Sequence, residues 1–412
     1  MGYLTEIFCC SRKRQRESVF KIHPTSHGKC IQKQRRRNIP KRPKEQCIPL
    51  IKYLQYSSEG KRSFVPVTTY EPLSLLQKLA EPFEYSFLLD KAAGTGNYAE
   101  QMKYIAAFSH VYAMKVCERI SRPFDPLLGE TFEMNRSDDM GFKFIAEQIS
   151  VAPKVAALHC AGIGWIFQSN FEYTFNIQTK FISINPVIRT TIFLKDYGSE
   201  FAWPMALTYR LHNILFGEVF FDVFGAVEIT EKKHSGRYSC RMEYFSKFSK
   251  KHDNSPDVVG SITRNKKPVI NLRGFWEKGL ESFQQYIAPN LKAEWTILWE
   301  YRPMSKDRED YYYFTEYVAQ LNELESCIAP TDSRLRPDIR NLENGKIKIG
   351  NAHKRSLEEK QFRRISNNWN LAPEKQYKPI WFAQNENGEW IYNGEYWQCK
   401  TVQDWSKCPQ IF

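Results

Sequence analysis

The chain has 412 residues, of which 42% are hydrophobic and 25% are charged, a composition typical of a folded domain with a sizeable core. Aromatic residues make up 15%, which favours extended strands or a wide apolar cavity. No apolar run approaches the roughly 18 residues of a membrane-spanning helix, and the order of apolar and basic residues at the N-terminus excludes a secretory signal. The ten cysteines lack paired spacing, which indicates a reduced, intracellular protein.

The formal net charge of +13 is concentrated at the N-terminus. Residues 1–62 contain 16 Lys or Arg and four Glu, whereas the other 350 residues contain 43 basic and 42 acidic residues. A strongly basic segment is attracted to phosphates, either on an anionic membrane surface or on nucleic acid. The sequence therefore predicts a nearly neutral domain that follows a basic arm.

Residues 1–46 have little apolar periodicity, and we expect them to be a disordered basic arm. Cys9 and Cys10 directly precede a basic cluster that begins at Arg12, which makes them candidate S-acylation sites. One acyl chain beside a basic patch supplies the two signals that stable membrane anchoring requires. A solvated basic tail or a nuclear-import run is the alternative interpretation. Nucleic acid is not expected as a partner, because the arm has few aromatic residues for base stacking.

Helical spacing of apolar residues dominates the next part of the chain. Ile48, Ile51 and Leu54 follow this spacing in a short segment, and it continues through residues 72–92 and 98–120. The stretch GTGNYA at residues 94–99 matches a dinucleotide-binding pattern on paper. Because it follows a helical stretch instead of a strand, we interpret it as a turn between two helices.

Strand-like segments then dominate as far as residue 301. Many of them alternate apolar with polar residues, the pattern of antiparallel strands with one buried face. So many consecutive strands without helices between them indicate a large antiparallel meander that curls into a barrel. A helix near 313–325, a charged segment near 352–366 and an aromatic C-terminal section complete the predicted α+β, mainly β, fold.

Motifs of catalysis and of metal or nucleotide binding are missing from the sequence. There is no phosphate-binding glycine loop, no zinc-protease helix, no nucleophile elbow and no calcium loop. The eight histidines do not cluster with cysteines or acidic residues at ligand spacing. We therefore expect neither an enzyme nor a protein with a cofactor or metal.

Three stretches carry more specific information: RPFDPLLGETF at 122–132, EQIS at 147–150 and PTDSRLRPDIRNLENG at 330–345. Together with EPLS at 71–74, SLEEKQ at 356–361 and the C-terminal GEYWQCK and DWSKCPQIF, they resemble the oxysterol-binding protein family in order and spacing. The resemblance covers about residues 62–412. It describes a short member, since the basic arm leaves no room for a pleckstrin-homology domain.

This resemblance implies a large, nearly closed antiparallel β-barrel around a hydrophobic tunnel, with flanking helices and an N-terminal lid. The lipid-binding domain would span residues 47–412, with the lid near residues 48–62. Ile48, Ile51 and Leu54 would form the apolar face of this lid, and a core-packing helix is the alternative interpretation of that segment.

The family also uses a basic pocket at the tunnel mouth to bind the headgroup of phosphatidylinositol 4-phosphate, where clustered cations neutralise the phosphates. Matched by motif position, Arg122 is the basic residue before PFDPLLGE, and Leu127 belongs to the adjacent turn. Lys354 and Glu358 match the lysine and glutamate of the family's K-x-x-L-E-E-K-Q-R helix.

The sequence departs from the family pattern at this pocket. The family signature resembles EQVSHHPP, but Val151 and Ala152 stand at the positions of the two histidines. Phe362 replaces an arginine, and Asp125 stands where Asn is usual. Losing three phosphate-binding donors should weaken headgroup binding by orders of magnitude. Lys154 and Arg363 are nearby cations that could compensate for the loss.

We therefore interpret the chain as a monomeric, cytosolic and peripherally membrane-associated protein that carries a sterol or similar lipid between membranes. Its expected partners are a sterol or other lipid and an anionic membrane surface, and phosphatidylinositol 4-phosphate stays open as a further ligand. Exchange against phosphatidylinositol 4-phosphate is doubtful because the histidine pair is replaced. The alternative hypothesis is a sensor or tether that binds membrane lipid without net transfer.

Overall fold

The computed structural model describes residues 34–43, 65–117, 119, 121–178, 181–213, 219–233, 237–249, 255–275, 279–284, 294–301, 307–369 and 376–412. Arg35–Phe412 belong to one compact unit. The predicted lid residues Ile48, Ile51 and Leu54 and the candidate acylation sites Cys9 and Cys10 lie outside the described residues. Among the described residues, no helix is both long and apolar enough to cross a membrane.

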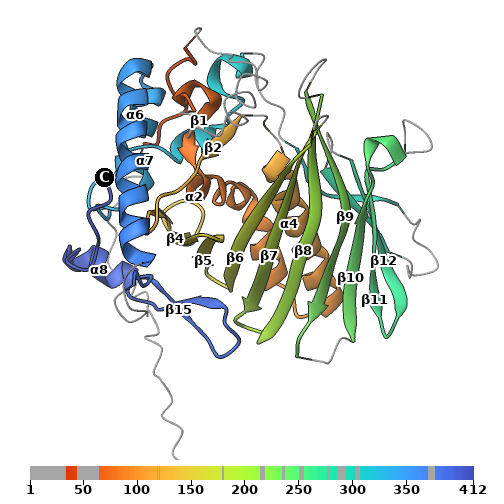
Figure 1. The fold of residues 1–412 in the computed structure, drawn as a ribbon. Coiled ribbons are helices and arrows are strands. Elements are labelled where there is room, and N and C mark those ends of the chain that lie inside the picture. Colours follow the sequence, from red (N-terminus) through yellow and green to blue (C-terminus); the bar gives the residue numbers. More distant parts are fainter. Residues whose placement is uncertain are drawn as a thin grey trace, which may run out of the picture. The chain divides into compact units, whose positions relative to one another are not determined.

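In the described part of the chain, twelve consecutive strands form one antiparallel sheet in which every strand pairs with its neighbours in sequence (Figure 1). This confirms the predicted meander. Among the residues that the structure describes, the two edge strands β3 and β14 are not paired with each other, so closure into a barrel remains a prediction. The strands are β3 (Thr131–Arg136), β4 (Phe142–Val151), β5 (Lys154–Ala161), β6 (Trp165–Ile177), β7 (Phe181–Leu194), β8 (Ser199–His212), β9 (Phe220–Glu231), β10 (Tyr238–Tyr244), β11 (Val258–Arg264), β12 (Lys267–Phe275), β13 (Gly279–Gln284) and β14 (Thr296–Glu300).

Alternating side chains give the sheet one apolar face, as the sequence pattern predicts. In β8, Phe201, Trp203 and Met205 are buried, while the residues between them are partly or fully exposed. Helix α4 (Tyr98–Cys117) packs against this face and contacts β8 to β14 (Figure 1). The hydroxyl of Tyr209 in β8 donates a hydrogen bond to the carbonyl of Ala113 in α4, 3.2 Å away. The main hydrophobic core therefore lies between α4 and the sheet.

The segment before α4 differs from the expected helix over residues 72–92. Strand β1 (Tyr70–Ser74) pairs in parallel with β2 (Arg122–Phe124), so the chain is extended where a helix was expected. Pro72 fits an extended segment, and Ser74 begins the next helix through a capping box with Gln77. The short helix η1 (Val67–Thr69) precedes β1, and the helical elements that follow β1 are α2 (Leu75–Lys78), η2 (Glu81–Tyr85) and α3 (Phe87–Ala93).

The turn predicted between two helices at residues 94–99 is confirmed. Helix α3 ends at Ala93, and α4 begins at Tyr98. The side-chain oxygen of Asn97 accepts a hydrogen bond of 3.0 Å from the backbone N–H of Ala99, which caps the start of α4. This stretch is therefore a helix connection and not a dinucleotide-binding loop.

The C-terminal part packs beside β3 to β5. Its longest element is α7, which extends the predicted charged segment at both ends (Figure 1). Buried Glu147 in β4 ties the following segment to the sheet, because its carboxylate accepts hydrogen bonds from the Tyr377 hydroxyl and from the N–H groups of Ile380 and Trp381. The elements are η4 (Arg308–Tyr311), α5 (Glu316–Gln320), η5 (Ser333–Leu335), α6 (Pro337–Glu343), α7 (Ile347–Trp369), β15 (Phe382–Gln384), β16 (Trp390–Tyr392) and α8 (Tyr396–Val402).

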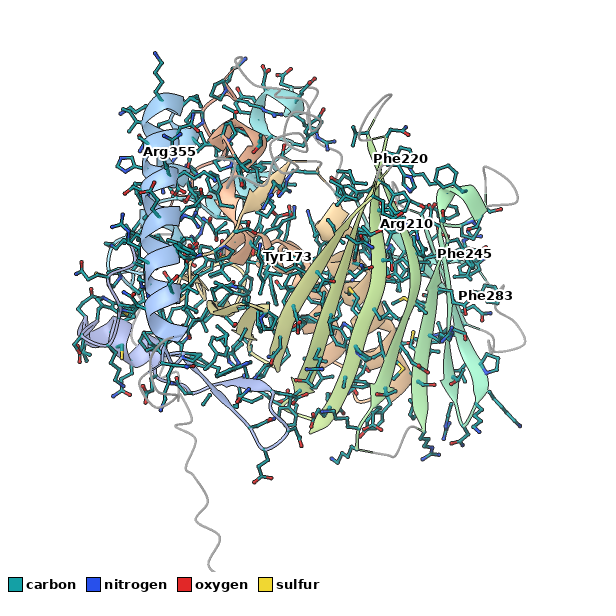
Figure 2. All side chains as sticks on the ribbon, in the orientation of Figure 1. Tyr173, Arg210, Phe220, Phe245, Phe283 and Arg355 are labelled. Carbon is teal, nitrogen blue, oxygen red and sulfur yellow. The ribbon has the colours of Figure 1, made fainter. Side chains whose placement is uncertain are left out.

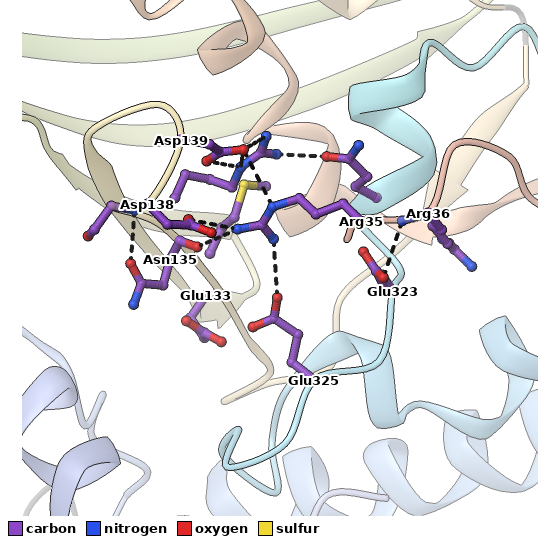
Figure 3. A network of polar contacts seen from close by, with 12 residues as sticks. Arg35, Arg36, Glu133, Asn135, Asp138, Asp139, Glu323 and Glu325 are labelled. Carbon is purple, nitrogen blue, oxygen red and sulfur yellow. Dashed lines mark hydrogen bonds and ion pairs between the residues drawn. The ribbon is translucent and has the colours of Figure 1, made fainter. Parts of the chain in front are cut away.

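Residues 35–43 differ from the expectation that residues 1–46 form a disordered arm. Arg35 points between the β3–β4 turn and Glu325, and its guanidinium pairs with Asp138 at 3.0 Å and with Glu325 at 3.4 Å (Figure 3). Ile39 is buried in a small cluster with Tyr312. This part of the predicted arm therefore contacts the domain, since Arg35 meets acidic residues more than 100 positions away.

Candidate functional site

The RPFDPLLGE motif forms a loop that is held in place by the side chains of Glu130, Arg336 and Gln361. Glu130 is fully buried, and its carboxylate accepts hydrogen bonds from the Leu127 N–H at 2.9 Å and from Arg336 at 2.8 Å. Desolvation raises the pKa of Glu130, while the charge of Arg336 opposes that rise. The Leu128 N–H donates to Gln361 of α7 at 2.8 Å. Leu127 therefore acts through its backbone and its packing, and the loop is fixed against α7.

Gly129 allows this loop to turn where no other residue fits well. Its φ angle is +81°, in the left-handed region that favours glycine. A Cβ atom at this position would lie 2.8 Å from the Tyr377 hydroxyl oxygen. The Gly129 N–H also donates to the Gln148 carbonyl of β4 at 3.0 Å. The conformation of the loop thus depends on glycine in the LLGE stretch.

Asp125 of this loop binds polar groups from three strands, β2, β5 and β6. One carboxylate oxygen accepts from Lys154 at 3.0 Å and from the Tyr173 hydroxyl at 2.8 Å, and the other accepts from Arg122 at 2.7 Å. Although desolvation raises the pKa of Asp125, the charges of Arg122 and Lys154 outweigh it and hold this pKa well below its ordinary value. Asp125 is therefore an ionised, partly exposed carboxylate among three donors. Tyr173 is marked on β6 in Figure 2.

Lys354 of α7 brings a third positive charge to the same place. Its ammonium group is buried and pairs with Glu358, one turn further along the helix. The guanidinium of Arg122 and the ammonium of Lys354 both lie over the ring of Tyr70, at 4.8 and 5.1 Å from its centroid. Burial lowers the pKa of Lys354, and the charge of Glu358 opposes this effect. We refer to Arg122, Lys154 and Lys354 as the cation cluster.

Two arginines of the PTDSRLRPDIR motif, Arg334 and Arg336, lie beside the cluster and are paired with carboxylates. Arg336 pairs with Glu130 and with Asp338 at 2.9 Å, and it also donates to the backbone carbonyl of Asp125 at 2.8 Å. Arg334 pairs with Asp332 and Glu133 in the same buried layer. The motif therefore fixes the loop that carries Asp125.

The two residues at the family's histidine positions lie at the β4–β5 turn. Val151 ends β4 and pairs with Lys154 at the start of β5, and Ala152 is exposed between them. The turn thus reaches the cation cluster, but its apolar side chains provide no donor there. Lys154, one of the two candidate compensating cations, lies in the cluster and binds Asp125.

The other departures lie on α7 and differ in outcome. Phe362 is 45% exposed, one further turn along the helix from Glu358. Arg363 is also exposed and forms no ion pair within the part of the chain that the structure describes. Arg364 is half-buried near Tyr377, and burial lowers its pKa. The structure therefore brings Lys154, but not Arg363, to the site.

Sequence reasoning missed two aromatic members of the site. Tyr70 lies just before the segment for which the sequence predicts a helix, and the place of its ring beneath two cations depends on the pairing of β1 with β2. Tyr173 was one of many alternating residues in a long strand, with no signal to distinguish it from core residues. Arg336 was noted only as part of a motif. The sequence alone does not show which strands pair with each other, and that pairing brings these residues to the site.

The family model described as oxysterol-binding protein matches residues 58–401. The chain belongs to the oxysterol-binding protein family. It is 34% identical to mouse oxysterol-binding protein 2 over 376 residues, a match that covers 84% of this chain and 41% of the relative. It is 33% identical to oxysterol-binding protein-related protein 1B of Arabidopsis thaliana over 360 residues, which covers 84% of this chain and 70% of that relative. The chain thus spans less than half of the first of these relatives.

Solved structures of the oxysterol-binding protein family agree with the observed fold. The Osh3 ORD in complex with PI(4)P from Saccharomyces cerevisiae matches with a TM-score of 0.76 at 27% identity, covering 92% of this chain and 99% of that one. The Osh1 ORD domain in complex with cholesterol matches with a TM-score of 0.79 at 23% identity, covering 92% and 95%. At that identity, the second likeness supports the fold alone.

Proposed function

We propose that this chain binds a sterol or similar lipid and transfers it between membranes. The observation that carries this proposal is the family match over residues 58–401, on a fold that covers 92% of the chain when compared with lipid-bound domains. Moving a sterol through water exposes several hundred Å² of apolar surface, at about 25 cal/mol per Å². An apolar tunnel, closed by a lid, would remove that cost during transfer.

The sheet supplies a suitable frame for such a tunnel. Its apolar face carries large side chains along the long strands, among them Trp203 of β8, and α4 covers part of this face. The nearly closed barrel and the lid near residues 48–62 belong to this proposal. The lid would open at the membrane to load or release its lipid, as the family resemblance implies.

Exchange against phosphatidylinositol 4-phosphate is not part of the proposed transfer cycle. The β4–β5 turn carries Val151 and Ala152 where the resemblance implies a histidine pair. Two members of the cation cluster, Arg122 and Lys154, are already bound by Asp125. A phosphate headgroup would therefore find fewer hydrogen-bond donors than the family pattern implies, and it would compete with the Asp125 carboxylate for Arg122 and Lys154.

An aromatic and basic surface supports membrane contact. The turn η3 (Lys247–Ser249) displays Phe248, which is 71% exposed and contacts the rings of His212 and Phe220. Buried Asp222 fixes this turn, because its carboxylate accepts hydrogen bonds from Ser246 at 2.6 Å and from the Lys247 N–H at 2.8 Å. A fixed, exposed phenylalanine beside a lysine suits the interface of an anionic bilayer.

This surface and the cation cluster lie at the same end of the sheet. Alternate strands of an antiparallel sheet run in the same direction, so β4, β6, β8 and β10 all end on one side. The β4–β5 turn leads to Lys154, and the β10–β11 connection contains Phe248. Figure 2 marks Arg210 and Phe220 near this end of the long strands. One docked orientation could therefore bring both features to a membrane.

Extraction of labelled sterol from vesicles of phosphatidylcholine and phosphatidylserine tests this proposal and separates it from the tether hypothesis. After the vesicles are separated from the solution, the full chain should be found in the vesicle-free fraction with sterol bound. A tether would instead stay on the vesicles and remove no sterol from them. Phe248→Asp should reduce extraction severalfold while sterol supplied from cyclodextrin still binds normally. Vesicle binding without sterol removal by the wild type would overturn the transfer proposal.

A further inference from the structure

We propose that Asp125 is an internal counter-anion which occupies the anion-binding position of the cation cluster and excludes lipids with phosphorylated headgroups. This inference rests on the proposed lipid-binding function and names the residue that limits its cargo. The ligand class excluded is the phosphate monoester on a lipid headgroup, and lipids without such a group remain as cargo.

The contacts of Asp125 are those that a bound phosphate oxygen would receive. Its two carboxylate oxygens accept from a guanidinium, an ammonium and a phenol, at 2.7, 3.0 and 2.8 Å. Charge-assisted hydrogen bonds of this kind are the strongest that a protein offers to an anion. A phosphate that entered the cluster would have to share these donors with Asp125 or displace it.

Displacement is opposed by the way the loop is held. The backbone carbonyl of Asp125 accepts from Arg336 at 2.8 Å, and Leu127 and Leu128 just beyond it are fixed by Glu130 and Gln361. The side chain therefore starts from an anchored backbone. It stays ionised at neutral pH, since Arg122 and Lys154 keep its pKa low despite desolvation.

The remaining charges attract a second anion only weakly. Lys354 is paired with Glu358, so two carboxylates already neutralise most of the charge of the three cations in the cluster. Arg336, the next cation, is engaged by Glu130 and Asp338. A phosphate monoester carries about −1.5 to −2 charge at pH 7 and would place it within a few Å of the Asp125 carboxylate. Repulsion between these like charges would oppose headgroup binding.

Asparagine at this position is the direct test, because it keeps the shape of the side chain and one acceptor oxygen while removing the charge. Binding of glycerophosphoinositol 4-phosphate to the full chain would be measured by calorimetry for wild type and Asp125→Asn. We expect at least tenfold tighter binding by the variant, which corresponds to about 1.4 kcal/mol. Adding Lys154→Ala to Asp125→Asn should remove most of the gain, since that ammonium would then be missing.

Asp139→Asn is the matched control, because Asp139 is also a partly exposed carboxylate paired with an arginine, Arg136. It should leave headgroup binding unchanged. Inorganic phosphate and glycerophosphoinositol serve as the other probes. A gain for the 4-phosphate headgroup that exceeds the gain for both probes identifies a lipid headgroup, whereas an equal gain for inorganic phosphate identifies a general anion site and overturns the headgroup assignment.

Sterol binding from cyclodextrin reports folding and separates this inference from the proposed function. A variant that binds sterol normally but shows no gain, or a loss, in headgroup affinity would overturn the inference. A headgroup gain without sterol binding by any form would instead overturn the sterol proposal. Asp125→Ser, which also removes the charge, provides a second variant if Asp125→Asn binds no sterol.

Discussion

Single residues decide the chemistry of this site more than the fold does. A cation site is formed by the RPFDPLLGE loop, the supporting arginines and helix α7, which carries Lys354. Val151, Ala152 and Asp125 reduce the number of hydrogen-bond donors that this site offers to an anion. The sequence motifs predicted this cation site and the positions at which it departs from the family pattern. They could not show that Asp125 binds two of the cations, because that depends on side-chain geometry across three segments.

Glu147 links the pH of the solution to the attachment of the C-terminal segment. Burial raises the pKa of Glu147 from 4.5 to about 7, against the hydrogen bonds from Ile380, Trp381 and Tyr377. A carboxyl whose pKa is higher in the folded state binds its proton more tightly there. Its contribution to stability is therefore full below about pH 4.5 and is lost as the pH rises through about 7.

We predict that Glu147→Gln reduces the loss of stability between pH 5 and pH 8. The wild type should lose on the order of 1–3 kcal/mol more than the variant over this interval. Urea unfolding at several pH values, followed by tryptophan fluorescence, measures the difference. Parallel pH profiles of the two proteins would contradict the assignment to Glu147.

At the scale of elements, periodicity predicted the strands and helix α4 well, because their apolar residues recur at the spacing of a buried face. The helix expected near residues 313–325 is shorter, since α5 spans Glu316–Gln320, and α7 was expected only as a charged segment. It failed for β1, whose partner β2 lies about 50 residues away. It also failed for residues 35–43. A run of arginines resembles a solvated tail in sequence, and its acidic partners are distant in the chain.

The segment containing Arg35 provides a test at this scale. Its side chain is only 10% exposed and pairs with three carboxylates, those of Asp138, Asp139 and Glu325 (Figure 3). Arg35→Ala should lower the free energy of unfolding by about 1–3 kcal/mol, since these partners lose their charged hydrogen bonds. Arg37→Ala is the matched control, because Arg37 belongs to the same run but is exposed.

Thermal unfolding of the two variants would measure the difference. Arg35→Ala should melt several degrees below the wild type, and Arg37→Ala should match it. Equal melting temperatures for both variants would mean that the described contacts do not stabilise the domain. The same outcome would restore the view that this part of the arm is available to phosphates.

At the scale of the whole molecule, the central claim is lipid transfer that does not depend on a phosphoinositide gradient. The fold and the family follow from motifs spread over some 350 residues, together with the match over residues 58–401. The cargo does not follow from them, because the side chains that would line the proposed tunnel and select a lipid cannot be identified from periodicity. The occupied cation cluster and the replaced histidine positions instead indicate transfer without phosphoinositide exchange.

The most direct measurement is the rate at which the full chain moves labelled sterol between two vesicle populations, with and without phosphatidylinositol 4-phosphate in the acceptor. We predict transfer at the same rate in both cases, because the Asp125 carboxylate already holds Arg122 and Lys154. Counter-transport of the phosphoinositide should be undetectable. A marked acceleration of sterol transfer, together with reverse movement of the phosphoinositide, would contradict the account.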